Sequence, residues 1–170
     1  METVTQKTQL LSDEQVRRKI SRMAYEIYES NFEEKNLILA GIDGQGYVLA
    51  KLLLTELNKI SDLNCSVVRV TVDKASPESG EVILDVPLKE LSKKNIILVD
   101  DVLNTGRILT YGMKPILSTV VKKIEVAVLV NRSHARFPIW PRYTGYELST
   151  TLDDHIEVVL VKKFGVYLHG

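Results

Sequence analysis

The sequence predicts an α/β fold in which a mostly parallel β-sheet is flanked by helices. Short, continuously apolar runs, such as residues 37–42 and 96–99, are typical of strands buried on both faces. Segments with apolar residues at helical spacing lie between those runs, and this alternation favours parallel strands joined by helices. The chain has 170 residues without a repeat, a low-complexity segment or a linker, so we expect a single domain over residues 1–170.

An N-terminal arm and a helix are expected to open the chain. We interpret residues 1–11 as a loose arm. Ser12 and Gln15 have the spacing of a capping box, in which each side chain bonds the backbone N–H of the other residue. Apolar residues recur at helical spacing from Val16 onward, and this pattern predicts the first helix.

The remaining elements alternate between strands and helices. The expected strands are residues 37–42, 66–72, 81–86, 95–99, 124–130 and 156–161, with 166–168 continuing or pairing with the last one. The expected helices are residues 48–60 and 107–119, the second kinked at Pro115. Residues 131–145 are expected to be irregular. Ligands of such sheets bind beyond the carboxyl ends of the strands, where the loops after Ile42, Val99 and Val130 fall.

Composition excludes several classes of function. Lys and Arg number 22 and Asp and Glu number 22, and this zero net charge argues against a surface that coats nucleic acid. Cys65 is the only cysteine, which rules out an internal disulfide or a Cys-rich zinc site and fits a reducing compartment. Residues 1–11 lack the apolar core of a secretory signal, and no apolar run approaches the ~20 residues that cross a bilayer. We expect a cytoplasmic protein without membrane contact.

One segment, residues 96–107, carries the clearest chemistry. A buried strand delivers Asp100 and Asp101 to its carboxyl end, and adjacent strand residues point to opposite faces. One or both carboxylates can accept hydrogen bonds from the vicinal hydroxyls of a sugar. Thr105 and Gly106 then lead into a helix, whose first N–H groups suit a phosphate. Carboxylates for a ribose beside amides for a phosphate indicate a ribose phosphate ligand.

The segment Leu98-Val-Asp-Asp-Val-Leu-Asn-Thr-Gly-Arg107 resembles the phosphoribosyl pyrophosphate signature of type I phosphoribosyltransferases. Within that family it is most similar to the bifunctional pyrimidine operon regulators and uracil phosphoribosyltransferases. The first helix, the glycine-containing loop after Ile42 and residues 128–139 resemble the same group in order and spacing, so the likeness covers residues 16–161. It implies the type I phosphoribosyltransferase fold with a small hood region, Mg²⁺ as cofactor, and a homodimer or higher homo-oligomer.

The resemblance also implies a role for particular residues. Asp100 and Asp101 would be the catalytic pair, holding the ribose hydroxyls directly or through the metal. The 5′-phosphate would lie on Asn104, Thr105, Gly106, Arg107 and Ile108. The pyrophosphate would contact Asp43, Gly44, Gln45 and, from the loop at residues 73–80, Lys74. The nucleobase would lie on Phe137, Pro138 and Ile139.

Three features depart from the family's pattern. Ile108 stands where the family usually has threonine, so one hydroxyl donor, worth about 1 kcal/mol, is lost. Gln45 stands where relatives usually carry a basic residue, and charge-assisted bonds are the stronger kind. The loop at residues 73–80 is shorter than in relatives and has Lys74 as its only cation. These departures predict weakened binding of phosphoribosyl pyrophosphate.

The predicted reaction is the attack of a nucleobase nitrogen on C1 of the ribose, with pyrophosphate as the leaving group. The resemblance favours uracil as the base, and a purine such as hypoxanthine or guanine, read by Phe137 or Trp140, is an alternative. A second alternative is an RNA-binding regulator with weak or no catalysis, and a third is an inactive relative. The candidates for RNA contacts are Arg17, Arg18, Arg22, Arg132, His134 and Arg136.

Overall fold

The computed structural model describes residues 6–151 and 153–170, which form nine strands and three α-helices. The strands are β1 Lys7–Leu11, β2 Asn36–Ile42, β3 Asn64–Thr71, β4 Ile83–Leu84, β5 Asn95–Leu103, β6 Lys123–Asn131, β7 Tyr143–Glu147, β8 His155–Val159 and β9 Gly165–His169. The helices are α1 Asp13–Asn31, α2 Gln45–Ile60 and α3 Arg107–Gly112, with 3₁₀ turns at Leu88–Leu91 and Ile116–Ser118.

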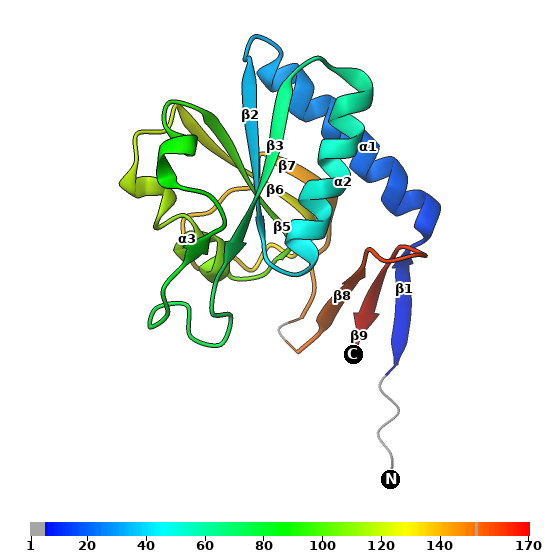
Figure 1. Cartoon of the computed structure of the whole chain (residues 1–170). Coiled ribbons are helices and arrows are strands. Elements are labelled where there is room, and N and C mark those ends of the chain that lie inside the picture. Colours follow the sequence, from blue (N-terminus) through cyan, green and yellow to red (C-terminus); the bar gives the residue numbers. More distant parts are fainter. Residues whose placement is uncertain (1–5, 152) are drawn as a thin grey trace.

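The main sheet has six strands in the order β4-β3-β2-β5-β6-β7. All pairs are parallel except β3 with β4, which confirms the predicted α/β class. Helices α1 and α2 cover one face, and the short α3 lies on the other (Figure 1). None of the helices in the described part of the chain is long and apolar enough to cross a membrane.

Burial on both faces explains the unbroken apolar run of β5. Ile97 and Val99 pack in the core beneath α1 and α2, whereas Ile96 and Leu98 pack in the core on the opposite face. The parallel register pairs Val99 with Gly41 of β2. The carboxyl ends of β2 and β5 therefore meet at one edge of the sheet, where ligands of such folds bind.

The first helix begins as the capping box predicts. The Gln15 N–H donates to the Ser12 hydroxyl, and the Ser12 N–H donates to Oε1 of Gln15. The predicted helix over residues 107–119 is shorter than expected, because α3 ends at Gly112 and a separate turn follows Pro115. The prediction that residues 131–145 are irregular is wrong at their end, since β7 begins at Tyr143, which is buried against α1.

A second, antiparallel sheet in the order β1-β9-β8 forms a hood beside the carboxyl edge of the main sheet (Figure 1). The interpretation of residues 1–11 as a loose arm is wrong for Lys7–Leu11, because this segment pairs with β9 and Leu11 is buried. Residues 1–5 of that arm lie outside the described residues. Of the two alternatives for residues 166–168, the structure shows pairing with the preceding strand, with Ile156 opposite Leu168.

Candidate active site

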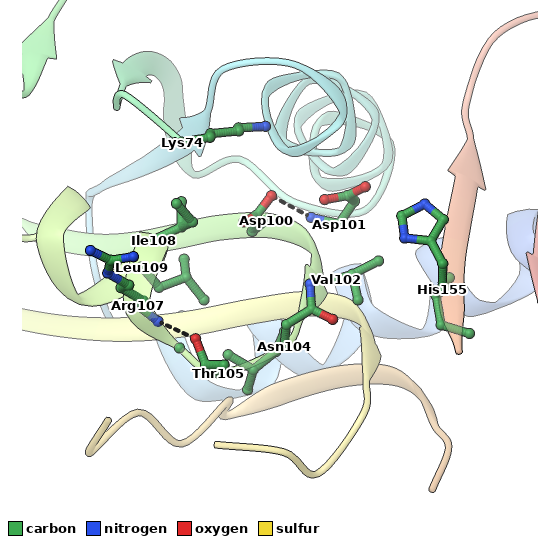
Figure 2. A pocket seen from close by; sticks show the side chains of 13 residues that line it. Lys74, Asp100, Asp101, Val102, Asn104, Thr105, Arg107, Ile108, Leu109 and His155 are labelled. Carbon is green, nitrogen blue, oxygen red and sulfur yellow. Dashed lines mark hydrogen bonds between the residues drawn. The ribbon is translucent and has the colours of Figure 1, made fainter. Parts of the chain in front are cut away.

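A cavity of about 310 Å³ lies at the carboxyl end of β5, between the loop that leads into α3 and the first residues of β8 (Figure 2). It brings together the acidic pair, the loop after it and Lys74, which the sequence predicted to act together. The lining residues are Lys74, Asp100, Asp101, Val102, Leu103, Asn104, Thr105, Gly106, Arg107, Ile108, Leu109, His155 and Ile156.

The two carboxylates of the pair have different surroundings. Asp100 is buried, and Asp101 is partly exposed. A Cβ at Gly46 would lie only 2.8 Å from Oδ1 of Asp100, so the start of α2 passes directly over this carboxylate. The Asp101 N–H donates to the same oxygen at 2.8 Å. Asp100 is thus fixed by backbone, whereas Asp101 keeps its side chain at the cavity wall (Figure 2).

Burial gives Asp100 an unusual protonation equilibrium. Loss of solvent, followed by the neighbouring charge of Asp101, raises the pKa of Asp100 well above the ordinary 3.8. The Lys74 ammonium acts in the opposite direction. A cation that entered beside the pair would relieve the repulsion between the carboxylates and favour the ionised form.

The loop of residues 104–108 turns sharply into α3. Gly106 has φ +86°, a left-handed conformation that side chains rarely adopt. The Arg107 N–H donates to the Thr105 hydroxyl at 3.3 Å, and the carbonyl oxygen of Thr105 accepts from the N–H of Arg136 at 2.7 Å. The first N–H groups of a helix have no partner within the helix, so this turn offers donors to an anion.

Residues of the predicted pyrophosphate site lie on two loops that meet. A Cβ at Gly44 would lie 3.4 Å from Nζ of Lys74, and Lys74 also lines the cavity beside Asp100. Asp43 forms an ion pair with Arg69 at 3.4 Å, outside the lining of the cavity. Oε1 of Gln45 is buried and has no hydrogen-bond partner among the described residues.

The structure does not bring Phe137, Pro138 and Ile139, the predicted base site, into the lining of the cavity. Ile139 is buried behind Gly106, and a Cβ added to that glycine would lie 3.3 Å from the Cβ of Ile139. Phe137 packs edge-on against Tyr111, with ring centroids 6.3 Å apart. Ile139 and Phe137 support the loop of residues 104–108 from outside, because the chain after β6 passes behind that loop.

His155 and Ile156, at the start of β8, line the cavity instead. No pattern in the sequence selects them, since a histidine before a terminal strand is most often a surface residue. Only the placement of the hood over the carboxyl edge brings His155 toward Asp101 (Figure 2).

The predicted RNA-contacting residues fall into two groups. Arg17, Arg18 and Arg22 lie on α1 and form ion pairs with Asp13, Glu14 and Glu26. Arg132 is only 7% exposed, and its guanidinium is bonded within the protein, so it cannot reach a phosphate at the surface. Nε2 of His134 lies 2.8 Å from the carbonyl oxygen of Thr150. The backbone N–H of Arg136 supports Thr105.

The chain belongs to the phosphoribosyl transferase domain family, which it matches over residues 6–160. It is a phosphoribosyltransferase. Proteins named "Bifunctional protein PyrR" are similar along most of the chain. The one from Fusobacterium nucleatum is 31% identical over 158 residues, which cover 89% of each chain. The one from Bacillus cereus is 32% identical over 165 residues, which cover 91% of each chain.

Solved structures confirm the fold. The hypoxanthine phosphoribosyltransferase of Trypanosoma cruzi matches with a TM-score of 0.73 at 16% identity, covering 84% of this chain and 82% of that one. A hypoxanthine-guanine phosphoribosyltransferase from Bacillus anthracis matches with a TM-score of 0.69 at 17% identity, covering 83% and 82%. At such low identity the likeness concerns the fold alone.

Proposed function

We propose that the chain transfers the 5-phosphoribosyl group from 5-phosphoribosyl-1-pyrophosphate to uracil and releases pyrophosphate. The observation that carries this proposal is the single cavity that joins Asp100 and Asp101 to the loop of residues 104–108. In the reaction, the bond between C1 of the ribose and pyrophosphate oxygen breaks. A bond from a base nitrogen to C1 forms, and the base loses the proton from that nitrogen.

Each part of the cavity has a role in this proposal. The N–H groups of the loop at residues 104–108 and the Thr105 hydroxyl bind the 5′-phosphate. Asp101 accepts hydrogen bonds from the ribose hydroxyls, and the negative charge of the pair stabilises the positive charge that develops at C1. Lys74, beside Gly44, binds the departing pyrophosphate.

The residues present fit a magnesium ion that binds together with the substrate. No group of three or more His, Cys, Asp or Glu side chains in residues 6–151 and 153–170 could hold a metal by itself. Mg²⁺ usually takes one or two carboxylates and completes its shell with waters and phosphate oxygens, and the mutually repelling pair of buried Asp100 and partly exposed Asp101 suits it. When bound, the ion would neutralise the pyrophosphate.

The base is proposed to lie between β5 and the hood, against Val102, His155 and Ile156. Two apolar side chains and one imidazole provide a surface for the flat base and a group that can donate or accept a hydrogen bond. The choice of uracil as the base is supported by the similarity to the PyrR proteins along about nine-tenths of each chain. Hypoxanthine and guanine, which the names of the structural relatives mention, are the competing bases.

The first experiment measures pyrophosphate release from phosphoribosyl pyrophosphate and Mg²⁺ with uracil, hypoxanthine, guanine and adenine in separate reactions. We expect turnover with uracil and its loss in Asp101→Asn. Turnover with a purine alone would transfer the assignment to the purine alternative. Binding of phosphoribosyl pyrophosphate without turnover on any base would identify an inactive relative or a regulator.

An RNA-binding regulator is the second candidate, and one surface favours it. A groove between the hood and α1 contains Arg18, Lys19 and Arg22 beside Tyr146, which offers cations and an aromatic ring to a nucleic acid. The ion pairs of Arg18 and Arg22 with acidic residues act against strong binding there. RNA affinity that fell steeply with added salt and required Lys19 would support this function.

We further propose a homo-oligomer located in the cytoplasm. Trp140 is 73% exposed and lies beside Val126 of β6, and Leu117 is 65% exposed and lies beside Tyr111 of α3. Light scattering would detect the oligomer, and Trp140→Ser should shift it toward the monomer.

Burial raises the pKa of the Cys65 thiol to about 11, which suits an unreactive side chain in a reducing compartment.

A further inference from the structure

Arg132 is a buried arginine that the proposed chemistry does not use. It follows β6 directly, and its backbone N–H donates to the carbonyl oxygen of Leu103 at 3.1 Å. The guanidinium donates from Nη1 to Oδ1 of Asn104 at 2.8 Å. From Nε and Nη2 it donates to the Thr150 hydroxyl at 3.0 and 2.8 Å. Nη2 also reaches the carbonyl oxygens of Thr151 at 3.1 Å and Asp154 at 2.7 Å.

These bonds join the two walls of the cavity. Asn104 begins the loop that is proposed to bind the 5′-phosphate. Thr150, Thr151 and Asp154 lie just before β8, whose first residues, His155 and Ile156, form the opposite wall. The planar guanidinium therefore spans from the phosphate loop to the segment that sets the start of the hood strand.

The charge and planar shape of the Arg132 guanidinium make this connection between the two walls rigid and specific to arginine. All five bonds are charge-assisted, which makes them stronger than bonds between neutral groups. Within the described residues the guanidinium forms no salt bridge, and its acceptors are amide, hydroxyl and carbonyl oxygens. A lysine could not replace it, because an ammonium has three donors at a single point and cannot reach both sides in one plane.

We propose that Arg132 is a positioning residue that couples the two halves of the site. When phosphoribosyl pyrophosphate orders the loop at residues 104–108, Asn104 holds the guanidinium, and the guanidinium holds the start of β8 where the base is received. The inference rests on the proposed function for the identity of the two ligands. The phosphate loop keeps independent support, since the N–H groups of Arg136 and Phe137 bond the Thr105 carbonyl oxygen. The base wall should thus depend on Arg132 more than the phosphate loop does.

Kinetics of Arg132→Lys provide the first test. We expect the KM for uracil to rise about tenfold, the size of one lost charge-assisted bond, while the Kd for phosphoribosyl pyrophosphate changes less than about threefold. Arg142→Lys is the matched control, because Arg142 lies in the same segment but pairs with Glu125 at 3.6 Å, away from the cavity. A lower melting temperature with both constants unchanged would show a structural role only and overturn the proposal.

Thr150→Val provides a second variant in case Arg132→Lys fails to fold. It removes the hydroxyl that accepts two of the five bonds, and Thr150 is not among the residues that line the cavity. We expect the same selective rise in the KM for uracil, smaller than in Arg132→Lys. If both variants fold, their effects should be less than additive, because they break the same connection. Full additivity would contradict the coupling.

Hydrogen exchange separates this inference from the proposed function, since it needs no turnover. In the wild type, phosphoribosyl pyrophosphate with Mg²⁺ should slow exchange both at residues 104–108 and at residues 154–158. In Arg132→Lys or Thr150→Val, the protection at residues 104–108 should remain, and the protection at residues 154–158 should weaken. Protection of the hood that persisted in both variants, or was absent in the wild type with ligand bound, would refute the coupling even if uracil were the substrate.

Discussion

The two walls of the cavity differ in how the chain builds them. The wall made by β5 and the loop at residues 104–108 is one continuous segment, so consecutive residues of the sequence provide its polar groups. The hood wall is made by β8, which is stabilised by β9 and, through it, by β1 at the other end of the chain. The half that is proposed to bind the phosphoribosyl group can therefore be identified from neighbouring residues, whereas the half that is proposed to bind the base depends on contacts between distant segments.

Asp100→Asn should have the largest effect and mark the β5 wall as the catalytic one. Removal of a charge aimed at the reacting centre typically lowers turnover about 100-fold or more. Pyrophosphate release with saturating substrates measures this loss. Retention of turnover within a few-fold of the wild type would remove Asp100 from the catalytic pair.

The same variant should unfold less easily than the wild type. The folded-state pKa of Asp100 is raised, chiefly by burial, so the stability linked to its protonated form is present below pH 3.8 and is lost as the pH rises through the raised pKa. The amide that replaces the carboxyl group stays neutral at every pH. Thermal unfolding of both proteins should therefore show that Asp100→Asn is the more stable, by a difference in melting temperature that grows with pH above 3.8. A difference that stayed constant or shrank with rising pH would contradict the burial argument.

Gly106→Ala should weaken the β5 wall through the backbone. Its φ of +86° disfavours a side chain, and a Cβ would lie 3.3 Å from the Cβ of Ile139. We expect a loss of about 2 kcal/mol in the free energy of unfolding, measured with urea, and a higher KM for phosphoribosyl pyrophosphate. Gly170→Ala, with no atom within 4 Å of the added Cβ, is the control and should change neither.

Ile108→Thr should strengthen the same wall by a smaller amount. A hydroxyl at this position of the cavity lining adds one donor for the 5′-phosphate. One added hydrogen bond of about 1 kcal/mol corresponds to a roughly fivefold lower Kd for phosphoribosyl pyrophosphate, which calorimetry can measure. An unchanged Kd would mean that the 5′-phosphate does not lie against residue 108.

His155→Ala should have the smallest effect, confined to the hood wall. The imidazole lines the cavity from β8, so its loss should raise the KM for the base about threefold through one neutral hydrogen bond. The Kd for phosphoribosyl pyrophosphate should stay constant. A change in that Kd without a change for the base would reverse the assignment of the two walls.

Much of the main sheet could be predicted because its patterns are local. The apolar run of β5, buried on both faces, and the alternation of Val68, Val70 and Val72 each identify a strand from neighbouring residues. The capping box of Ser12 and Gln15 likewise needs only three residues of separation. By contrast, β7 follows two prolines, and its placement depends on the packing of Tyr143 beneath α1.

The sequence by itself determined the α/β class and the nearness of the acidic pair to the loop of residues 104–108, because a strand, a turn and a helix that follow one another bring their residues together by chain connectivity. Only the tertiary structure decided that Lys7–Leu11 joins the hood and that His155 faces Asp101. It also decided that Arg132 is buried between the two walls. Such facts depend on pairing and burial between residues far apart in the chain, which no local pattern encodes.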